Sequence, residues 1–186
     1  MKMRSLLIAL ALFTGIATAS AQTIPSADEV LKEGLAQAKK EKKNLFIMFH
    51  ASWCGWCHLM DTSMADPAVK PYFDKSYVIK HLVVNEAKDK KNLENPGAVD
   101  FLKKYHADNQ GIPMWLVFDP KGNLLGDSQQ RPAGVGFDQA GKNVGCPATK
   151  EEVEHFVKVL KATTSLKENE LAAIETRFRK NDRSAH

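Results

Sequence analysis

The chain has 186 residues, of which 44% are hydrophobic, and 26 basic residues stand against 22 acidic ones, giving a formal net charge of +4. Its length suits one domain with an ordinary core. Basic and acidic residues alternate along the chain, which argues against a nucleic-acid-binding surface.

Residues 1–21 have the three-part layout of a secretory signal peptide. Lys2 and Arg4 precede an apolar segment over residues 6–16, and small residues follow up to Ala21. The apolar segment is well short of the ~20 residues that span a bilayer, and no later segment is long and apolar enough to do so. We therefore expect cleavage after Ala21, a mature chain without a membrane span, and a periplasmic or secreted location.

A first helix is predicted over residues 26–43. Ser26 is a suitable N-cap because Glu29 follows three residues later and completes a capping box. One face of the helix is expected to be buried. Its apolar residues at helical spacing are Val30, Leu31, Leu35 and Ala38.

The unbroken apolar run over residues 45–49 predicts a buried central strand of a parallel or mixed sheet. Helical spacing resumes from Cys54 towards Met64, so Cys54 is expected at the N-terminus of a helix. The helix dipole and the free backbone N–H groups there lower a thiol pKa from about 8.5 towards 3.5–7.5. Cys57 follows one turn later and can close a disulfide with Cys54. The pair predicts thiol–disulfide exchange.

The same residues fit two other chemistries. Cys54 and Cys57, followed by His58, also match the attachment pattern of c-type haem. Together with Cys146 they would supply four zinc ligands of the usual kind. However, Cys57 and His58 are adjacent on a helix and poorly placed to bind one metal ion. The motif by itself leaves these alternatives open.

Four segments are predicted between the cysteine helix and the next motif. They are a short helical piece over 66–73, a strand over 77–84, a charged surface connection over 85–96 and a helix over 97–106. The strand is rich in β-branched residues. The helix is expected to bury Val99, Leu102 and Tyr105.

A strand over residues 111–118 is entered through Pro113, which sheets tolerate only at a strand's start or at an edge. The turn residues of 119–123 predict a hairpin that leads into a further strand starting at Leu124. Residues 129–145 are glycine-rich and have no usable periodicity. They predict a long loop, which in a compact domain is either functional or an elaboration.

A penultimate helix is predicted over residues 149–163. Thr149 and Glu152 form its capping box. Its periodicity indicates an amphipathic helix. The residues that it is expected to bury are Val153, Phe156, Val157 and Leu160.

A last helix is predicted from a cap at Ser165 and Glu168 to about Arg179. Its surface is strongly charged, so it is expected to pack along a single stripe. The stripe consists of Leu171, Ile174 and Phe178.

The order of these elements resembles the thioredoxin fold over residues 30–161. Two separated motifs carry the resemblance, Ala51-Ser52-Trp53-Cys54-Gly55-Trp56-Cys57 and, downstream, Gly111-Ile112-Pro113 before an apolar strand. It implies an α/β fold, a central mixed β-sheet flanked by helices, with an extra C-terminal helix at 165–180. We expect residues 22–186 to form a single thioredoxin-like domain and a monomer. The haem alternative fits this pattern poorly, because c-type cytochrome domains are small and mostly helical.

The resemblance also implies roles for single residues. Cys54 is the expected exposed nucleophile that forms a mixed disulfide, and Cys57 is the more buried thiol that resolves it. In the family the motif proline is cis and faces the cysteines. The expected substrate-binding residues are Trp53, Trp56, Ile112, Pro113 and Gly145. Gly145 resembles a family glycine that allows close approach, and no cofactor or metal is implied.

Two features depart from the family, and a third cysteine is left over. Thioredoxins carry a buried acid six residues before the first cysteine, where this chain has Met48, so His50 and His58 become the candidates for proton transfer. Trp56 replaces the family's proline between the cysteines, so the direction of electron flow is not implied. Cys146 is predicted to face the groove as an accessory thiol, and not to be a buried structural one.

Together these residues predict an exported thiol–disulfide oxidoreductase. Its expected partners are disulfide-containing exported proteins or small thiols, and a redox partner that recharges the cysteine pair. One alternative is a redox-silent module that binds peptides beside Ile112 and Pro113. The other is electron transfer through a haem held by Cys54, Cys57 and His58.

Overall fold

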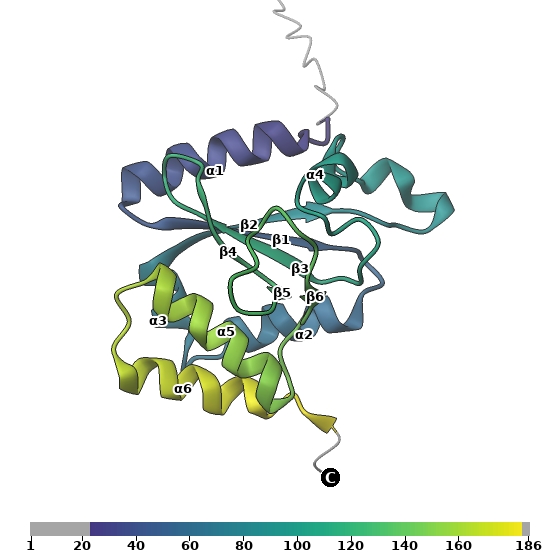
Figure 1. The fold of residues 1–186 in the computed structure, drawn as a ribbon. Coiled ribbons are helices and arrows are strands. Elements are labelled where there is room, and N and C mark those ends of the chain that lie inside the picture. The colour runs from purple at the N-terminus through teal and green to yellow at the C-terminus, as the bar shows by residue number, and fades with distance from the viewer. Residues whose placement is uncertain (1–22, 184–186) are drawn as a thin grey trace, which may run out of the picture.

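The computed structural model describes residues 23–183, and the predicted signal peptide of residues 1–21 lies outside the described residues. Within the described part, one sheet has the strand order β2-β1-β3-β4 (Figure 1). Its strands are β1 (Asn44–His50), β2 (Tyr77–Val83), β3 (Met114–Phe118) and β4 (Leu124–Asp127). β1 and β2 are parallel, whereas β3 is antiparallel to both β1 and β4. The predicted mixed sheet is confirmed.

Helices cover both faces of this sheet. α1 (Ala27–Glu41) and α4 (Ala98–Lys104) lie on one face (Figure 1). The helices of the other face are α2 (Gly55–Met64), α3 (Lys70–Ser76), α5 (Lys150–Thr163) and α6 (Glu168–Arg179). None of the helices in residues 23–183 is long and apolar enough to cross a membrane.

β1 is the central strand, and both of its faces are buried. Residues 45–49 are fully covered, and alternate side chains of a strand point to opposite faces. Phe46 and Met48 enter the core that contains Trp115 and Phe156. The others enter the core beneath α1 and α4; they are Leu45, Ile47 and Phe49. This double burial explains the continuous apolar run. The residues that follow β1 lie at the end of the sheet where the parallel strands β1 and β2 both terminate.

Two predicted helix starts are confirmed and one is wrong. The confirmed capping boxes are Ser26 with Glu29 in α1 and Thr149 with Glu152 in α5. The cap predicted at Ser165 is wrong, because α6 begins only after Lys167. There the Lys167 N–H donates to the Glu170 carboxylate at 2.8 Å. The acid that accepts a backbone N–H at the start of this helix is therefore Glu170 and not Glu168.

The predicted buried faces of two helices are partly wrong. Val99 is 38% exposed, because α4 turns a neighbouring stripe towards the sheet. That stripe consists of Ala98, Phe101 and Leu102. In α5 Val157 is only half-buried, whereas Val159 is buried against the sheet. The core stripe of α6, in contrast, is buried as predicted.

The connection after β2 is not confined to the surface. Its 3-10 helix, η1 (Lys88–Leu93), buries none of its residues, but Glu86 and Asn95 on either side are buried. The Asn95 side chain accepts the Val83 N–H at 2.7 Å and donates to the Pro25 carbonyl at 2.8 Å. The prediction of a surface connection is therefore wrong for Glu86 and Asn95.

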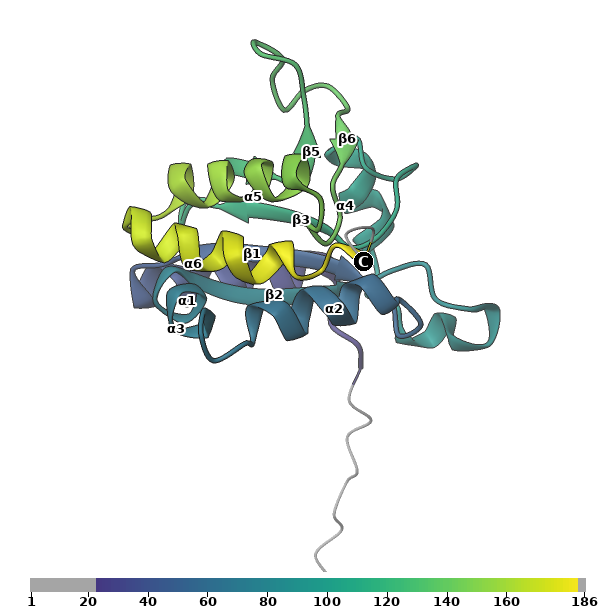
Figure 2. The same ribbon diagram turned by 90° about the horizontal axis from the view of Figure 1, so that it is seen from below.

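Residues 129–145 leave the body of the protein as a narrow hairpin (Figure 2). β5 (Gln129–Gln130) and β6 (Lys142–Asn143) pair antiparallel at its base. Arg131 donates to both oxygens of the Asp127 carboxylate at 2.8 Å, and both side chains are buried. Strands of two residues have no readable alternation, which is why the sequence predicted only a loop.

Candidate active site

Cys54 and Cys57 form a disulfide at the N-terminus of α2. The chain leaves β1, turns through Ala51, and reaches Cys54 as the N-cap residue of the helix. The Cys57 N–H donates to the Cys54 sulfur at 3.1 Å. A helix N-terminus stabilises negative charge, so this geometry favours the thiolate form of Cys54 once the disulfide is reduced.

Both cysteine residues are nearly covered in this oxidised form. Cys54 is 3% exposed and Cys57 is fully buried. The expectation of an exposed Cys54 is therefore wrong here, because Ala51 and Ile112 pack against the pair. Cys54 is nevertheless the member of the pair that reaches the surface.

The loop before β3 forms one wall of the site. The peptide bond between Ile112 and Pro113 is cis. The Ile112 carbonyl oxygen lies 3.6 Å from the Cys54 sulfur. A disulfide sulfur carries no hydrogen, so this is a van der Waals contact that becomes an S–H···O interaction only in the reduced thiol.

A groove of about 240 Å³ lies beside this loop. It is lined by Trp56, Gly111, Ile112, Pro113, Asn143, Val144, Gly145, Cys146, Ala148 and Glu152. The Asn143 amide donates to the carbonyls of Gly111 and Pro113 at 2.6 and 3.1 Å and accepts the Gly145 N–H at 3.1 Å. Asn143 thus ties β6 to the proline loop. Sequence reasoning missed it, because no signal distinguished it within the glycine-rich segment.

The backbone conformation at position 145 requires a glycine, whereas the space around it would admit a side chain. Its φ is +59°, a region that disfavours residues with a side chain. A Cβ at this position would lie 3.6 Å from the Pro113 carbonyl oxygen, which is an ordinary contact, so the expectation of unusually close approach is wrong. The Trp115 indole donates to the Gly145 carbonyl at 3.0 Å and fixes the loop to β3.

Two tryptophans present aromatic surface at the disulfide. Trp53 is 60% exposed and Trp56 is 46% exposed. The Trp53 indole donates to the Asn85 carbonyl at 2.9 Å, so its ring is held although it is open to solvent. Large exposed aromatic side chains of this kind are common at binding surfaces.

The family model of thioredoxin-like proteins matches residues 27–120, just over half of the chain. The chain belongs to the thioredoxin-like family. Solved structures with a similar fold include a disulphide isomerase from Xylella fastidiosa Temecula1, with 22% identity, 52% of this chain and 69% of that chain covered, and a TM-score of 0.43. A DsbH oxidoreductase has 20% identity, 84% and 95% coverage and a TM-score of 0.40. A thioredoxin from Thermus thermophilus has 20% identity, 70% and 80% coverage and a TM-score of 0.43. No curated protein matches the chain.

This thioredoxin-like chain holds its cysteine loop with a buried carboxylate, Glu86. One Glu86 oxygen accepts the Ser52 N–H at 2.5 Å and the other accepts the Ser52 hydroxyl at 2.9 Å. The hydrogen bond from the Ser52 backbone lowers the pKa of Glu86, so the carboxylate stays charged. Sequence reasoning missed Glu86; the available signal was an acid placed directly after β2, at the same edge of the sheet as the cysteines.

His50 lies in a small polar cluster where β1 ends. Its half-buried ring is 5.0 Å from the ring of His81, whose Nε2 lies 2.9 Å from an oxygen of Asp61. Burial, and then the neighbouring His81, lower the pKa of His50. The imidazole is therefore neutral at pH 7.

His58 lies on the exposed side of α2. Its Nε2 is 3.0 Å from the Ser52 carbonyl oxygen, which joins the helix to the same loop that Glu86 holds. Within the described residues, neither His50 nor His58 is hydrogen-bonded to a cysteine sulfur. Proton transfer by either histidine stays a prediction.

Cys146 lines the groove but is buried, so the prediction that it is not a buried structural thiol is wrong. Its sulfur accepts the Asn181 amide at 3.6 Å. Burial raises the pKa of Cys146 to about 12. A thiol that remains protonated at neutral pH is a poor nucleophile, which argues against a direct role in exchange.

The metal alternative fits these positions poorly. Cys54 and Cys57 are bonded to each other, and His58 faces the Ser52 backbone. In residues 23–183 no three His, Cys, Asp or Glu side chains are arranged to hold a metal ion.

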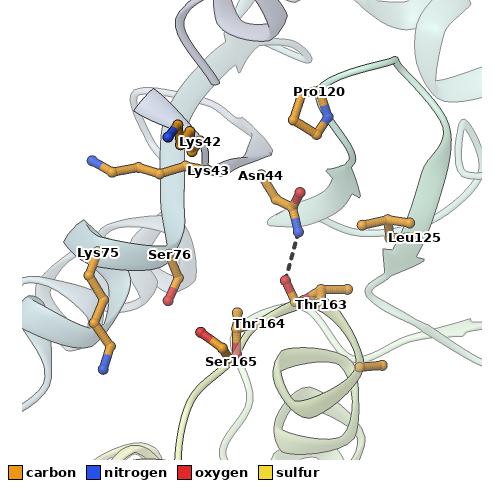
Figure 3. Close-up of a pocket in the computed structure, with 11 residues that line it drawn as sticks. Lys42, Lys43, Asn44, Lys75, Ser76, Pro120, Leu125, Thr163, Thr164 and Ser165 are labelled. Atoms are coloured by element: carbon orange, nitrogen blue, oxygen red, sulfur yellow. Dashed lines mark hydrogen bonds between the residues drawn. The ribbon is translucent and has the colours of Figure 1, made fainter. Parts of the chain in front are cut away.

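A larger cavity, of about 610 Å³, lies at the opposite end of β1 (Figure 3). Asn44 crosses it and donates to the Thr163 carbonyl at 2.7 Å. Of the lysines that line it, Lys43 is paired with Glu41 and Lys75 with Glu170, each at 2.6 Å. The cavity lies at the end of β1 opposite to the disulfide, and two of its three lysines are held in ion pairs, so size alone does not make it the functional site.

Proposed function

We propose that this protein is an exported thiol–disulfide oxidoreductase. The observation that carries the proposal is the Cys54–Cys57 disulfide at the start of α2, in contact with the Ile112 carbonyl beside an open groove. Membership of the thioredoxin-like family supports redox chemistry in general.

The exchange runs in two balanced steps. In the reducing direction the Cys54 thiolate attacks one sulfur of a substrate disulfide, forms a mixed disulfide and releases the other substrate sulfur as a thiolate. The Cys57 thiolate then attacks the Cys54 sulfur, releases the second substrate thiolate and leaves the Cys54–Cys57 disulfide. The same two steps in reverse oxidise a substrate dithiol. Cys57 takes up or releases one proton in each cycle.

The proposed substrates are disulfide-containing exported proteins or small thiols, which dock in the groove beside Ile112 and Pro113. A separate redox partner recharges the cysteine pair. Export is inferred from the sequence pattern of residues 1–21. One solved structure with a similar fold is that of an exposed pneumococcal lipoprotein thioredoxin, which is 19% identical to this chain.

The test uses the mature chain with single cysteine substitutions. Cys57→Ser should accumulate mixed disulfides through Cys54, whereas Cys54→Ser should abolish reduction of insulin disulfides by added dithiol. Cys146→Ser is the matched control, because a buried thiol with a raised pKa should leave turnover unchanged. Full turnover in Cys54→Ser would sink the assignment, and peptide binding without turnover in the parent would favour the redox-silent module.

The reduction potential of the pair decides the direction of electron flow. A value of about −120 mV corresponds to an oxidant, and a value of about −270 mV to a reductant. Equilibration with glutathione buffers, followed by alkylation of the free thiols, measures it.

A further inference from the structure

The chain continues well beyond the family match, and two of its last described residues, Asn181 and Arg183, contact residues that line the groove. The match ends at residue 120, whereas α6 and residues 180–183 follow much later. We propose that Arg183 is a specificity-determining residue of the redox groove, which favours disulfide substrates with carboxylates beside the reacting cysteine. This inference rests on the oxidoreductase function proposed above.

The segment after α6 is fixed by the buried side chain of Asn181. Its amide nitrogen donates to the Pro147 carbonyl at 3.2 Å and to the Cys146 sulfur at 3.6 Å. Its amide oxygen accepts the Ser63 hydroxyl at 3.2 Å and an Arg177 N–H at 3.1 Å. Asn181 thus binds α2, α6 and the loop that lines the groove. A buried amide with these partners holds the chain at one place.

The anchor determines where Arg183 can lie. Two residues of chain reach at most about 7 Å, so Arg183 remains close to the position that Asn181 sets. Its guanidinium carbon is 5.7 Å from the centroid of the Trp56 ring, which is a cation–π contact. Because Trp56 lines the groove, this contact places a positive charge beside the groove in which a substrate would dock.

Little other charge competes with Arg183 at this place. Of the described residues that line the groove, Glu152 alone carries a formal charge. Its carboxylate accepts two backbone N–H groups at 3.1 Å at the start of α5, where the helix dipole offsets the negative charge. Asp182 is paired with Arg179 at 3.2 Å. Arg183 has no ion-pair partner within residues 23–183, so it is available to a carboxylate on a substrate.

The expected preference is modest, because Arg183 is exposed and exposed ion pairs contribute little. It corresponds to about a two- to fivefold difference in rate between acidic and basic substrates. Screening should remove it at about 1 M salt, where the Debye length falls to about 3 Å.

The test compares two synthetic peptides that each contain one disulfide and differ only in Glu or Lys beside both cysteines. The second-order rate constant for reduction by the pre-reduced mature chain is followed by tryptophan fluorescence at low salt. The parent should reduce the Glu peptide about two- to fivefold faster than the Lys peptide. Arg183→Gln should equalise the two rates, Arg183→Lys should keep the order, and Arg183→Glu should reverse it. Lys180→Gln, an exposed cation in the same segment, is the matched control and should keep the parent ratio.

The outcomes separate this inference from the proposed function. Equal rates with both peptides in the parent, or the parent ratio in Arg183→Gln, would overturn the role of Arg183. Equal slowing of both peptides in Arg183→Gln would also overturn it, because the contact would then only hold Trp56. No reaction with either peptide would contradict the oxidoreductase function itself.

Discussion

Glu86 lies beneath the loop that carries Ser52 and Trp53, and its two oxygens bind the backbone and side chain of Ser52. Asn143 performs the same task for the proline loop on the other side of the disulfide. Each residue acts through the loop that it holds, so both are positioning residues. At the scale of the residue, the geometry around the cysteines therefore depends on polar side chains outside the cysteine motif.

Removal of the Glu86 carboxylate should slow disulfide exchange without abolishing it. In Glu86→Ala the Ser52 N–H loses its acceptor, so we expect the rate of insulin reduction to fall, with a smaller fall in Glu86→Gln, whose amide oxygen can still accept one hydrogen bond. The reduction potential should shift in the same variants. Asp89→Asn, an exposed acid in η1, is the control. Parent rates and potential in Glu86→Ala would show that the loop keeps its geometry unaided.

The two histidines whose pKa is lowered by burial, His50 and His155, should make the protein less stable in mild acid. In the unfolded chain each imidazole has its ordinary pKa of 6.5 and takes up a proton near that pH. In the folded protein the pKa is lower, so the same protonation occurs only at a lower pH. Their contribution is therefore complete above pH 6.5 and is lost as the pH falls through the folded pKa. Each histidine contributes at most about 1.4 kcal/mol per pH unit to the slope.

Urea unfolding between pH 7.5 and 4.5 measures this slope. His50→Asn and His155→Asn should each flatten it, and the double variant should flatten it further. A slope unchanged in the double variant would show that other groups cause the acid sensitivity.

At the scale of the element, the edge strand β4 lies unusually close to α5. A Cβ placed at Gly126 would come within 2.6 Å of a methyl group of Val159. Because Val159 is β-branched, its side chain has few other rotamers to adopt in a helix. The absence of a side chain at Gly126 therefore sets the distance between this strand and this helix.

Gly126→Ala should lower the free energy of unfolding by about 1–3 kcal/mol, which is the usual cost of overpacking. Urea denaturation monitored by circular dichroism measures it. Gly111→Ala is the control, because a Cβ there meets nothing within 4 Å, and its effect should stay within about 0.5 kcal/mol. Equal effects of both substitutions would contradict the close approach at Gly126.

At the scale of the whole molecule, α6 completes the core on the face that carries α2. Phe178 is fully buried and its ring centroid lies 4.8 Å from that of Phe156 and 6.3 Å from that of Phe73. Leu171 and Ile174 enter the same core. The C-terminal helix thus shares one hydrophobic core with elements within the family match, and after its end Asn181 and Arg183 contact residues that line the groove.

Phe178→Ala should lower the free energy of unfolding by about 3–5 kcal/mol, the usual cost of truncating a buried phenylalanine. Thr176→Ala, an exposed position on the same helix, should change it by no more than about 0.5 kcal/mol. Chemical denaturation of both variants checks the difference. A small loss in Phe178→Ala would mean that α6 packs only loosely on the sheet.

The features that the sequence by itself determined are those with local physical causes. The continuous apolar run of β1 follows from burial on both faces, and the caps at Ser26 and Thr149 from hydrogen bonds within one helical turn. The Cys54–Cys57 pair follows from spacing along a helix. These patterns, with the separate proline motif, were sufficient for the thioredoxin-like fold and the redox pair.

Only the tertiary structure decided the features that depend on partners distant in sequence. Glu86 is buried because Ser52, 34 residues earlier, supplies its donors, and Cys146 is buried because the C-terminal segment closes over it through Asn181. Val99 and Val159 show the same limit, since helical periodicity defines a stripe but the neighbouring element selects which stripe is buried. The contact of Arg183 with Trp56 joins residues that are far apart in the chain, and no local pattern encodes such a contact.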